Sequence, residues 1–381
     1  MKLLLLSIAL FSFSLFHAQT TTHTVNVNGT NRTYRLYVPT IYNGSTAVPI
    51  VFNFHGYGSN STQQEAYGEF RPIADTANFI LVHPQGLTVN GSTGWNNFGA
   101  PGAANADMDF VDKMITDLSA TYNIDANRIY STGMSNGGFM SYDLACFMSS
   151  RFAAIASVTG SMLQSHKQAC NSGHPMPVMQ IHGTADAVVT YAGTAGGFGV
   201  THIDSLVKFW VDFNHCSTTP AFTALPNINT ADNCTAEHYV YSGGTNGSTV
   251  EFYKIINGGH TWPGAIYQVN GNTNMDFSAS KEIWRFFSKY RLNNLTASVE
   301  EISVKDLAIY PNPSGGKFTV TLEKYAGTAI SVYNTLGALV HTQMLTSAST
   351  DVVFPAAQDG FYFYKIGKEG QTLATGKLIV K

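Results

Sequence analysis

The sequence predicts an α/β fold built on a mostly parallel β-sheet, followed by a small β-sandwich domain. Between residues 33 and 290, short apolar runs alternate with stretches whose apolar residues recur every three or four positions. Such alternation favours a parallel sheet with helices on both faces. After about residue 300 the pattern changes to short strands and turns without a helical period, which is typical of a β-sandwich. At 381 residues, the chain is also longer than one hydrophobic core usually serves.

The strand candidates of the first part are β-branched or aromatic, and several lack polar alternation, as strands buried on both faces do. They span residues 34–38, 50–55, 80–83, 129–132, 154–158, 178–182 and 250–256. Helices are predicted by the 3.6-residue period at 107–118, 136–148, 202–213 and 278–290. Strands of the second part are predicted at 318–322, 329–333, 339–344, 360–365 and 377–380. We therefore expect a main domain at 19–290, a linker at 291–303 and the β-sandwich at 304–381.

Residues 1–18 have the pattern of a secretory signal peptide. Lys2 supplies a positive charge, residues 3–16 form an apolar run interrupted only by serines, and Ala18 offers a small residue for cleavage. A membrane anchor is the alternative, but the run is too short to cross about 30 Å of hydrocarbon comfortably. We expect an exported, soluble chain with no transmembrane segment.

The charge balance excludes two classes of partner. A net charge of -3 without any basic run is too small to direct binding to nucleic acid or to an anionic membrane. Charged residues make up 12% of the chain, about half of the usual share of roughly 25%. Uncharged polar side chains must cover the surface instead, which suits uncharged polymers or small molecules.

The four cysteines, Cys146, Cys170, Cys216 and Cys234, are an even number in a chain expected to be exported. An oxidising compartment then predicts two disulfides. Three pairings are possible, and proximity in sequence favours Cys146–Cys170 with Cys216–Cys234. No cysteine or histidine spacing is typical of a zinc site, so we expect no metal.

A Gly-Met-Ser-Asn-Gly-Gly run at residues 133–138 follows one predicted strand and opens a predicted helix. This is the context of a nucleophile elbow, in which flanking glycines permit a tight turn and the serine oxygen is lifted clear of the backbone. The helix N-terminus then directs its free N–H groups at a forming oxyanion. We predict that Ser135 is a nucleophile rather than a helix cap in a glycine-rich turn.

A serine nucleophile needs a base, and the base needs an orienting acid, in the chain order Ser, acid, His for this fold. Asp186 follows the predicted strand 178–182, and His260 follows the strand 250–256 within a loop rich in glycine. The competing acids Asp204 and Asp212 fall in a predicted helix, and the competing base His182 ends a strand. We therefore expect Asp186 and His260 to complete a catalytic triad.

The oxyanion needs two N–H donors. We assign one to Asn136, next to the nucleophile, and the other to Tyr57, in a His-Gly-Tyr-Gly loop after strand 50–55. The rings of Tyr57, Trp95 and Trp262 lie near these loops in sequence and are predicted to contact substrate by stacking. Ordinary packing beneath a loop is the alternative for each ring.

In this order, the motifs resemble those of the polyhydroxybutyrate-depolymerase-like esterases, a group that also contains feruloyl and acetylxylan esterases. The motifs are residues 55–58, 94–96, 133–138, 182–186 and 259–264. The resemblance covers about residues 25–290. It implies an α/β-hydrolase fold, ester hydrolysis, and Ser135, Asp186 and His260 as the triad. It also implies a disulfide between Cys146 and Cys170, where this group tends to place one.

The tail resembles a different family. Residues 307–318, with 360–362 and 377–381, look like the C-terminal sorting domain of type IX secretion in Bacteroidetes. The resemblance implies a partner, the type IX secretion machinery, and a protein that is extracellular or attached to the cell surface. A substrate-binding β-sandwich is the alternative.

These features predict a secreted serine esterase that needs no cofactor. Its predicted substrates are feruloyl or other aromatic esters of plant polysaccharide, or a polyester similar to polyhydroxybutyrate. An acetylxylan esterase is one alternative. A prolyl-oligopeptidase-like peptidase is another, because those enzymes share the Gly-x-Ser-Asn-Gly-Gly elbow, although they normally carry a large N-terminal domain. An inactive carbohydrate-binding protein of the same fold is the non-enzymatic alternative.

Overall fold

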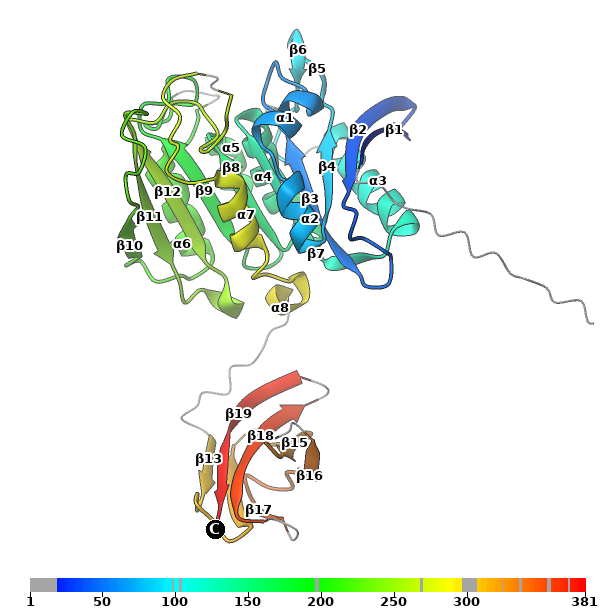
Figure 1. The fold of residues 1–381 in the computed structure, drawn as a ribbon, viewed down its shortest axis with the longest axis vertical. Helices are drawn as coiled ribbons and strands as arrows, with labels where there is room; N and C mark the ends of the chain where they lie inside the picture. Colours follow the sequence, from blue (N-terminus) through cyan, green and yellow to red (C-terminus); the bar gives the residue numbers. More distant parts are fainter. Residues whose placement is uncertain are drawn as a thin grey trace, which may run out of the picture. The chain divides into compact units, whose positions relative to one another are not determined.

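The computed structural model describes residues 19–97, 99–102, 105–195, 199–267, 270–296, 307–323, 325–335, 338–354, 358–368 and 371–381. The chain divides into two compact units, residues 1–297 and residues 298–381 (Figure 1). The predicted signal peptide, residues 1–18, lies outside the described residues, as does the predicted linker from residue 297 onward. Residues 291–296 were predicted as linker, but they contain helix α8 (Leu292–Thr296), whose Leu295 is buried in the first unit.

The first unit contains a ten-stranded sheet in the order β1-β2-β4-β3-β7-β8-β9-β12-β11-β10. All neighbours from β4 to β12 pair in parallel, whereas both ends of the sheet are antiparallel. The strands are β1 (Gln19–Val27), β2 (Thr30–Val38), β3 (Val48–Phe54), β4 (Ile80–Pro84), β7 (Ile124–Met134), β8 (Ala154–Val158), β9 (Val178–Gly183), β10 (Ala221–Ala224), β11 (Thr235–Tyr241) and β12 (Val250–Ile256). A separate hairpin joins β5 (Leu87–Val89) and β6 (Ser92–Gly94). The predicted mostly parallel sheet is confirmed.

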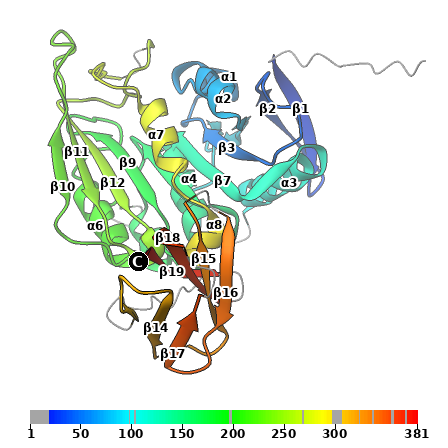
Figure 2. The ribbon, with the colours of Figure 1, turned by 60° about the horizontal axis from the view of Figure 1, so that its bottom comes forward.

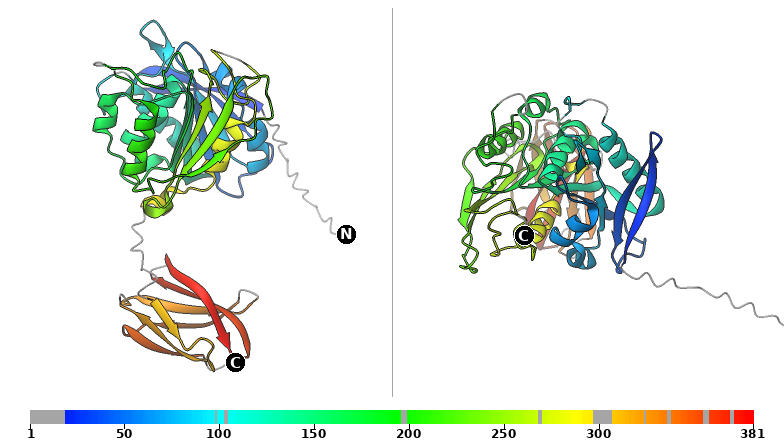
Figure 3. Two further views of the ribbon diagram at one scale, coloured as in Figure 1. Left: turned by 90° about the vertical axis from the view of Figure 1, so that its left-hand side faces the viewer. Right: turned by 90° about the horizontal axis from the view of Figure 1, so that it is seen from above.

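Helices cover both faces of this sheet, which the view from above shows (Figure 3, right). The helices are α1 (Ser61–Tyr67), α2 (Arg71–Ala77), α3 (Ala106–Thr121), α4 (Asn136–Phe147), α5 (Gln164–Ala169), α6 (Ile203–Phe213) and α7 (Ala279–Phe287), with short 3-10 turns at Ser149–Arg151 and Thr245–Gly247. Helix α7 crosses β8 and β9 (Figures 1 and 2). Among the described helices, none is long and apolar enough to cross a membrane.

The two faces of the sheet have separate hydrophobic cores because neighbouring side chains of a strand point to opposite sides. In β3, Phe52 belongs to the core that includes side chains of α3, α4 and α6, whereas its neighbour Val51 belongs to the core that includes side chains of α2 and α7. Both side chains are fully buried. The central strands are thus apolar on both faces, which explains why they lack polar alternation.

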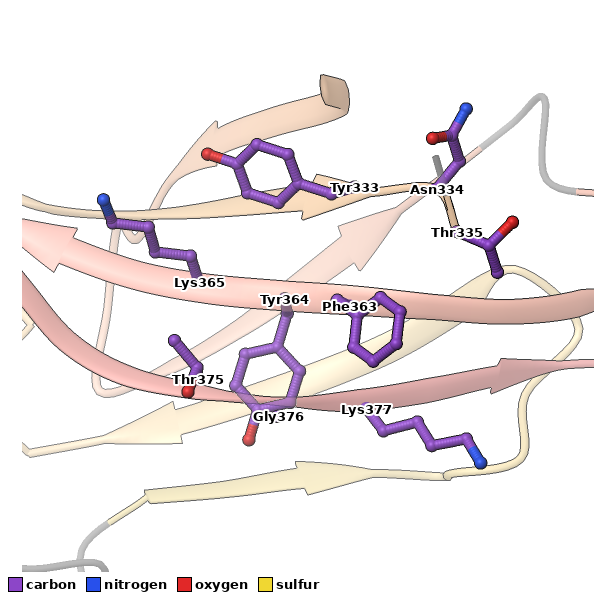
Figure 4. A pocket seen from close by; sticks show the side chains of 9 residues that line it. All are labelled: Tyr333, Asn334, Thr335, Phe363, Tyr364, Lys365, Thr375, Gly376 and Lys377. Atoms are coloured by element: carbon purple, nitrogen blue, oxygen red, sulfur yellow. The ribbon is translucent and has the colours of Figure 1, made fainter. Parts of the chain in front are cut away.

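The second unit is a β-sandwich of two sheets, in the orders β13-β14-β17 and β16-β15-β18-β19. The strands are β13 (Leu307–Tyr310), β14 (Lys317–Leu322), β15 (Thr328–Tyr333), β16 (Leu339–Met344), β17 (Ser349–Val353), β18 (Gly360–Lys368) and β19 (Gln371–Val380). Side chains such as Phe318, Ile330 and Val352 form its buried core. The larger sheet carries an open groove of about 680 Å³ across β15, β18 and β19, and Figure 4 shows the side chains that line it.

The cysteines correct one prediction. Cys146 and Cys170 form a disulfide, but Cys216 and Cys234 are free and buried. The pair was predicted from proximity in sequence, yet in space the two residues lie at opposite ends of strand β11. Cys234 directly precedes β11, whereas Ser217, next to Cys216, donates its N–H to Ser242 beyond the other end. A seven-residue strand is about 20 Å long, far beyond the Cα separation of roughly 4–7 Å that a disulfide needs.

Candidate active site

Ser135 lies at the turn between β7 and α4 and has a strained backbone, with φ 55° and ψ -120°. Its N–H donates to Val158 O at 2.9 Å, and its carbonyl accepts from Gly138 N at 2.8 Å. These hydrogen bonds fix the turn between the sheet and the first turn of α4. Strained residues at such a sharp strand-to-helix turn are typical of serine nucleophiles.

The glycines around Ser135 are required by close approach to β3. A Cβ atom at Gly133 would lie 2.6 Å from Phe54 O, and one at Gly137 would collide with the same oxygen. Gly138 packs equally closely, since a Cβ there would lie 2.5 Å from Ser157 Oγ. No side chain fits at these positions, so the sequence motif reflects the packing of α4 against the sheet.

Asp186 and His260 come together beside this turn, although 74 positions separate them in sequence. His260 Nδ1 lies 2.8 Å from Asp186 Oδ2, and both residues are buried. The other carboxylate oxygen, Oδ1, accepts from Val188 N at 2.8 Å and from Val189 N at 2.9 Å. The carboxylate is therefore held rigidly, and it orients the imidazole ring through Nδ1.

His182 supports the aspartate. Its Nε2 lies 2.8 Å from Val189 O and 3.4 Å from Asp186 Oδ2, and its Nδ1 lies 3.0 Å from Gln180 Nε2. Complete burial lowers the pKa of His182 to about 4, so the ring is neutral and acts as a donor to the loop after Asp186. The competing acids Asp204 and Asp212 both lie on α6, as predicted from their helical pattern.

The loop after β3 is organised by a buried histidine. His55 Nε2 accepts from Gly86 N at 2.9 Å, so Nδ1 carries the proton and donates to Gly56 O at 2.8 Å. Burial lowers the pKa of His55, which keeps the ring neutral. Within the described residues, the N–H of Tyr57, which follows Gly56 in this loop, makes no hydrogen bond. An unpaired donor thus lies beside Ser135, because Gly56 packs against the Ser135 side chain.

Asn136, whose N–H we predicted as the second donor, is fixed by its side chain. Its Oδ1 accepts from Trp95 N at 2.7 Å, and its backbone carbonyl accepts from Asn97 Nδ2 at 2.7 Å. As the first residue of α4, Asn136 has no acceptor for its N–H within the helix. The contacts of Trp95 and Asn97 with Asn136 were not predicted from the sequence. The only signal for them was the Gly-Trp-Asn-Asn run itself.

The structure contradicts the prediction that the rings of Trp95 and Trp262 contact substrate. Trp95 is 0% exposed, packs against Phe54, and donates from Nε1 to His55 O at 2.8 Å. Trp262 is 2% exposed and donates from Nε1 to Ser280 Oγ at 3.1 Å. Both rings pack beneath loops, so neither is available for stacking. Tyr57 differs from them because its side chain is 47% exposed.

Ser135 and His260 line one cavity of about 530 Å³. Within the part of the chain that is described, neither Ser135 Oγ nor His260 Nε2 has a hydrogen-bond partner, so both face the cavity unpaired. The remaining lining is mainly apolar and aromatic: Gly56, Tyr57, Gly58, Ser59, Gln63, Ala66, Tyr67, Met134, Val188, Tyr267 and Asn270. Gly56, Tyr57, Gly58 and Met134 fall within the sequence motifs, whereas no pattern in the sequence marked the other lining residues. No group of three or more His, Cys, Asp or Glu side chains among the described residues could hold a metal ion.

A serine at a strand-turn-helix junction, an Asp–His pair and an apolar cavity are features expected of an enzyme with the α/β-hydrolase fold. The family described as Esterase PHB depolymerase matches residues 32–195, a range that contains Ser135 and Asp186 and ends before His260. Probable feruloyl esterase C of Aspergillus clavatus is 30% identical over 52% of this chain and 75% of its own length. The chain therefore belongs to this esterase family, as its motifs predicted, and the first unit is a carboxylic-ester hydrolase.

Two further relatives extend the comparison. The bifunctional acetylxylan esterase/xylanase XynS20E of Neocallimastix patriciarum is 25% identical over 70% of this chain, and the match spans only 34% of the relative's length. The solved structure of an acetyl xylan esterase from Aspergillus awamori superposes with a TM-score of 0.52 at 16% identity, over 70% of this chain and 99% of that one. This likeness shows the α/β-hydrolase fold.

The second unit belongs to a different family. The family described as Secretion system C-terminal sorting domain matches residues 308–381. The predicted sorting domain is therefore confirmed, and it indicates export to the cell surface or beyond.

Proposed function

We propose that the first unit hydrolyses aromatic acyl esters of carbohydrates through an acyl-enzyme formed on Ser135. The observation that carries this proposal is the 2.8 Å contact between His260 Nδ1 and Asp186 Oδ2, beside a cavity that Ser135 and His260 both line. An oriented imidazole with its second nitrogen open to the cavity is what a serine nucleophile needs as its base.

In the first step, Ser135 Oγ attacks the ester carbonyl carbon while His260 Nε2 takes the hydroxyl proton. The N–H groups of Tyr57 and Asn136 stabilise the oxyanion, and Asp186 stabilises the imidazolium. His260 then gives the proton to the leaving alcohol oxygen. In the second step, water loses a proton to His260 and releases the acid from Ser135 by the reverse sequence. Catalytic hydrogen bonds that are long in a ligand-free enzyme tighten when substrate binds.

The lining of the cavity supports an aromatic acyl group. Tyr57, Tyr67 and Tyr267 offer rings, and Met134 and Val188 offer apolar contacts. A volume of about 530 Å³ is within the range of roughly 300–1,000 Å³ of small-molecule sites and is large for an acetyl group. Relatives of the family carry the names feruloyl esterase and acetylxylan esterase, so the acyl group is the point to test.

A panel of methyl ferulate, acetylated xylan and polyhydroxybutyrate tests the acyl specificity. We expect the highest kcat/KM for methyl ferulate. Preference for acetylated xylan would move the substrate class to acetyl esters, and preference for polyhydroxybutyrate would move it to polyesters. Faster cleavage of an aminoacyl anilide than of p-nitrophenyl acetate would favour a peptidase instead. Hydrolysis of none of these esters would favour an inactive binding protein.

We propose that residues 1–18 direct the chain across the inner membrane and are removed. We further propose that the type IX machinery recognises the second unit and then cleaves it from the first. Mass spectrometry of the secreted protein tests both cleavages, because each changes the mass by a known segment.

A further inference from the structure

A second buried histidine–carboxylate pair lies outside the proposed triad. His166, on α5, places Nδ1 2.7 Å from Oδ1 of Asp143, on α4. The other ring nitrogen, Nε2, lies 3.1 Å from Gly99 O. A carbonyl oxygen can only accept, so Nε2 carries a proton and donates it to Gly99. The ring thus joins α4 to residues 95–97 and 99–102, which we call the support segment.

The support segment covers one stripe of α4. Positions 136, 143 and 147 are spaced by seven and then four residues, which places their side chains on the same helical face. Asn136 is held by the first residues of the segment. Asp143 reaches the segment through His166. Further along, a Cβ atom at Gly102 would lie 3.7 Å from the Phe147 ring. The segment is therefore attached to α4 both at the nucleophile end and more than a turn beyond it.

Helix α5 is itself fastened to α4 at two places. The disulfide joins Cys146, three positions after Asp143, to Cys170, four positions after His166. The histidine–carboxylate pair is the second connection. A helix of six residues has little stability of its own, so these two connections fix where the His166 ring stands.

The pair is an inefficient way to stabilise the fold. Its second carboxylate oxygen, Asp143 Oδ2, is buried without a hydrogen-bond partner among the described residues. Burial also raises the pKa of Asp143. A buried ion pair that is incompletely hydrogen-bonded contributes little net stability, so its contact with the support segment accounts better for its presence.

We propose that His166 is a positioning residue for ester hydrolysis. Through Gly99, His166 holds the support segment in place against α4. Trp95 N and Asn97 Nδ2 of that segment fix Asn136, whose N–H is the proposed oxyanion donor. The inference rests on the proposed esterase function and adds a residue that touches neither the substrate nor the triad.

The protonation of the pair decides whether the contact with Gly99 exists. Asp143 is the only charged residue on α4 or the support segment, Lys167 is the only one on α5, and of these only Asp143 contacts the ring. Burial opposes a charge on His166, but the hydrogen bond with Asp143 outweighs it and raises the pKa of His166 above 6.5.

Above that pKa the pair loses one proton. The remaining proton stays on Nδ1 of His166, because the charged carboxylate is the stronger acceptor. Nε2 then no longer donates to Gly99 O. The contact is therefore present at low pH and lost as pH rises through the raised pKa. His260 acts as a base and must be neutral, so its protonation affects the acidic side of the profile instead.

The test compares kcat and KM for methyl ferulate in His166→Leu, His166→Gln and a control, from about pH 6 to about pH 9. Leucine removes the donor, whereas a glutamine amide can donate to Gly99 O at every pH because it does not titrate. The matched control is His174→Leu. His174 is also buried between two carbonyl oxygens, with Nδ1 2.8 Å from Pro175 O and Nε2 3.0 Å from Ser149 O, and neither belongs to the support segment.

We expect His166→Leu to lower kcat by about tenfold with KM unchanged. This is less than the roughly 10²–10³-fold loss on removal of an oxyanion donor, because the Asn136 N–H is displaced rather than deleted. In the natural enzyme kcat should fall as pH rises through the pKa of His166. His166→Gln should restore most of the loss and abolish that fall, whereas His174→Leu should keep the natural kcat and the fall.

Different failures identify different errors. An unchanged kcat in His166→Leu, an equal loss in His174→Leu, or an alkaline fall that persists in His166→Gln would overturn the role of His166 and leave the esterase function standing. If circular dichroism shows that His166→Leu does not fold, the pH profile of His166→Gln against the natural enzyme decides. If the natural enzyme hydrolyses no ester, the proposed function fails, and the inference fails with it.

Discussion

Glu251, at the start of β12, should be the strongest single electrostatic contribution to the stability of the first unit. It is 1% exposed, and it accepts hydrogen bonds from Arg285, from Lys289 at 2.9 Å and from His238 at 2.9 Å. Burial alone would raise the pKa of Glu251, but the hydrogen bonds from His238 and Arg285 outweigh it and lower the pKa from 4.5 to about 2. At about 1.36 kcal/mol per pKa unit, this depression corresponds to about 3 kcal/mol.

The sign of the pH dependence follows from the direction of this pKa change. A carboxyl group with a depressed pKa in the folded state stabilises the fold above its unfolded pKa, and the contribution is lost as pH falls. For Glu251 the loss should occur between about pH 4.5 and about pH 2. We therefore expect Glu251→Gln to lower the free energy of unfolding by about 3 kcal/mol at pH 7 and by much less near pH 2.

Urea unfolding followed by tryptophan fluorescence measures this change in the first unit alone, because the four tryptophans of the chain all precede residue 298. Asp212→Asn is the control, since its ion pair with Lys208 is exposed, and we expect it to cost less than about 1 kcal/mol. An equal loss in both variants at pH 7, or a loss for Glu251→Gln that does not change toward pH 2, would refute the reasoning.

Three further predictions concern the catalytic site and the cysteines. Asp186→Asn should lower kcat by about 10⁴-fold, because an amide that retains the Val188 and Val189 contacts presents NH₂ to His260 Nδ1 and favours the wrong tautomer of the ring. Steady-state kinetics measures the loss of kcat, and an unchanged circular dichroism spectrum shows that the fold is intact. A loss of kcat below tenfold would contradict the prediction. Trp95→Phe removes the Nε1 hydrogen bond to His55 O. It should lower kcat by about tenfold with little change in KM, because the residue positions the oxyanion loop. A change confined to KM would instead indicate that Trp95 contacts substrate. Thiol titration without reductant should find no reactive cysteine in the native chain and two after denaturation. Finding none after denaturation would show that Cys216 and Cys234 form a disulfide, as proximity in sequence predicted.

The central part of the fold was predictable because its signals are local. The parallel strands are continuous apolar runs, and the tight turn at Ser135 requires glycines at fixed offsets. Strands β1, β10 and β11 were missed for the opposite reason. They form the antiparallel ends of the sheet, and β10 is exposed at all four residues, so no apolar pattern marks it. Their pairing depends on neighbours that are distant in sequence.

The errors at the site have a common physical cause, which is the direction in which a side chain points. The sequence places Trp95 and Trp262 near catalytic loops but does not show which face of the loop is buried. In the structure, Trp95 Nε1 is held by a backbone carbonyl of the β3 loop, a partner that only the folded chain supplies. The same limit applies to Cys216 and Cys234, which are close in sequence but lie beyond opposite ends of β11.

The proposed catalytic centre is tested most directly by covalent labelling with a fluorophosphonate, followed by peptide mass spectrometry. Such a reagent reacts only with a serine that a folded site activates. We expect a single adduct, on Ser135, in the native protein and none in Ser135→Ala or in the urea-unfolded chain. A folded chain that takes up no label, or an adduct on a different serine, would contradict the assignment of Ser135 as the nucleophile.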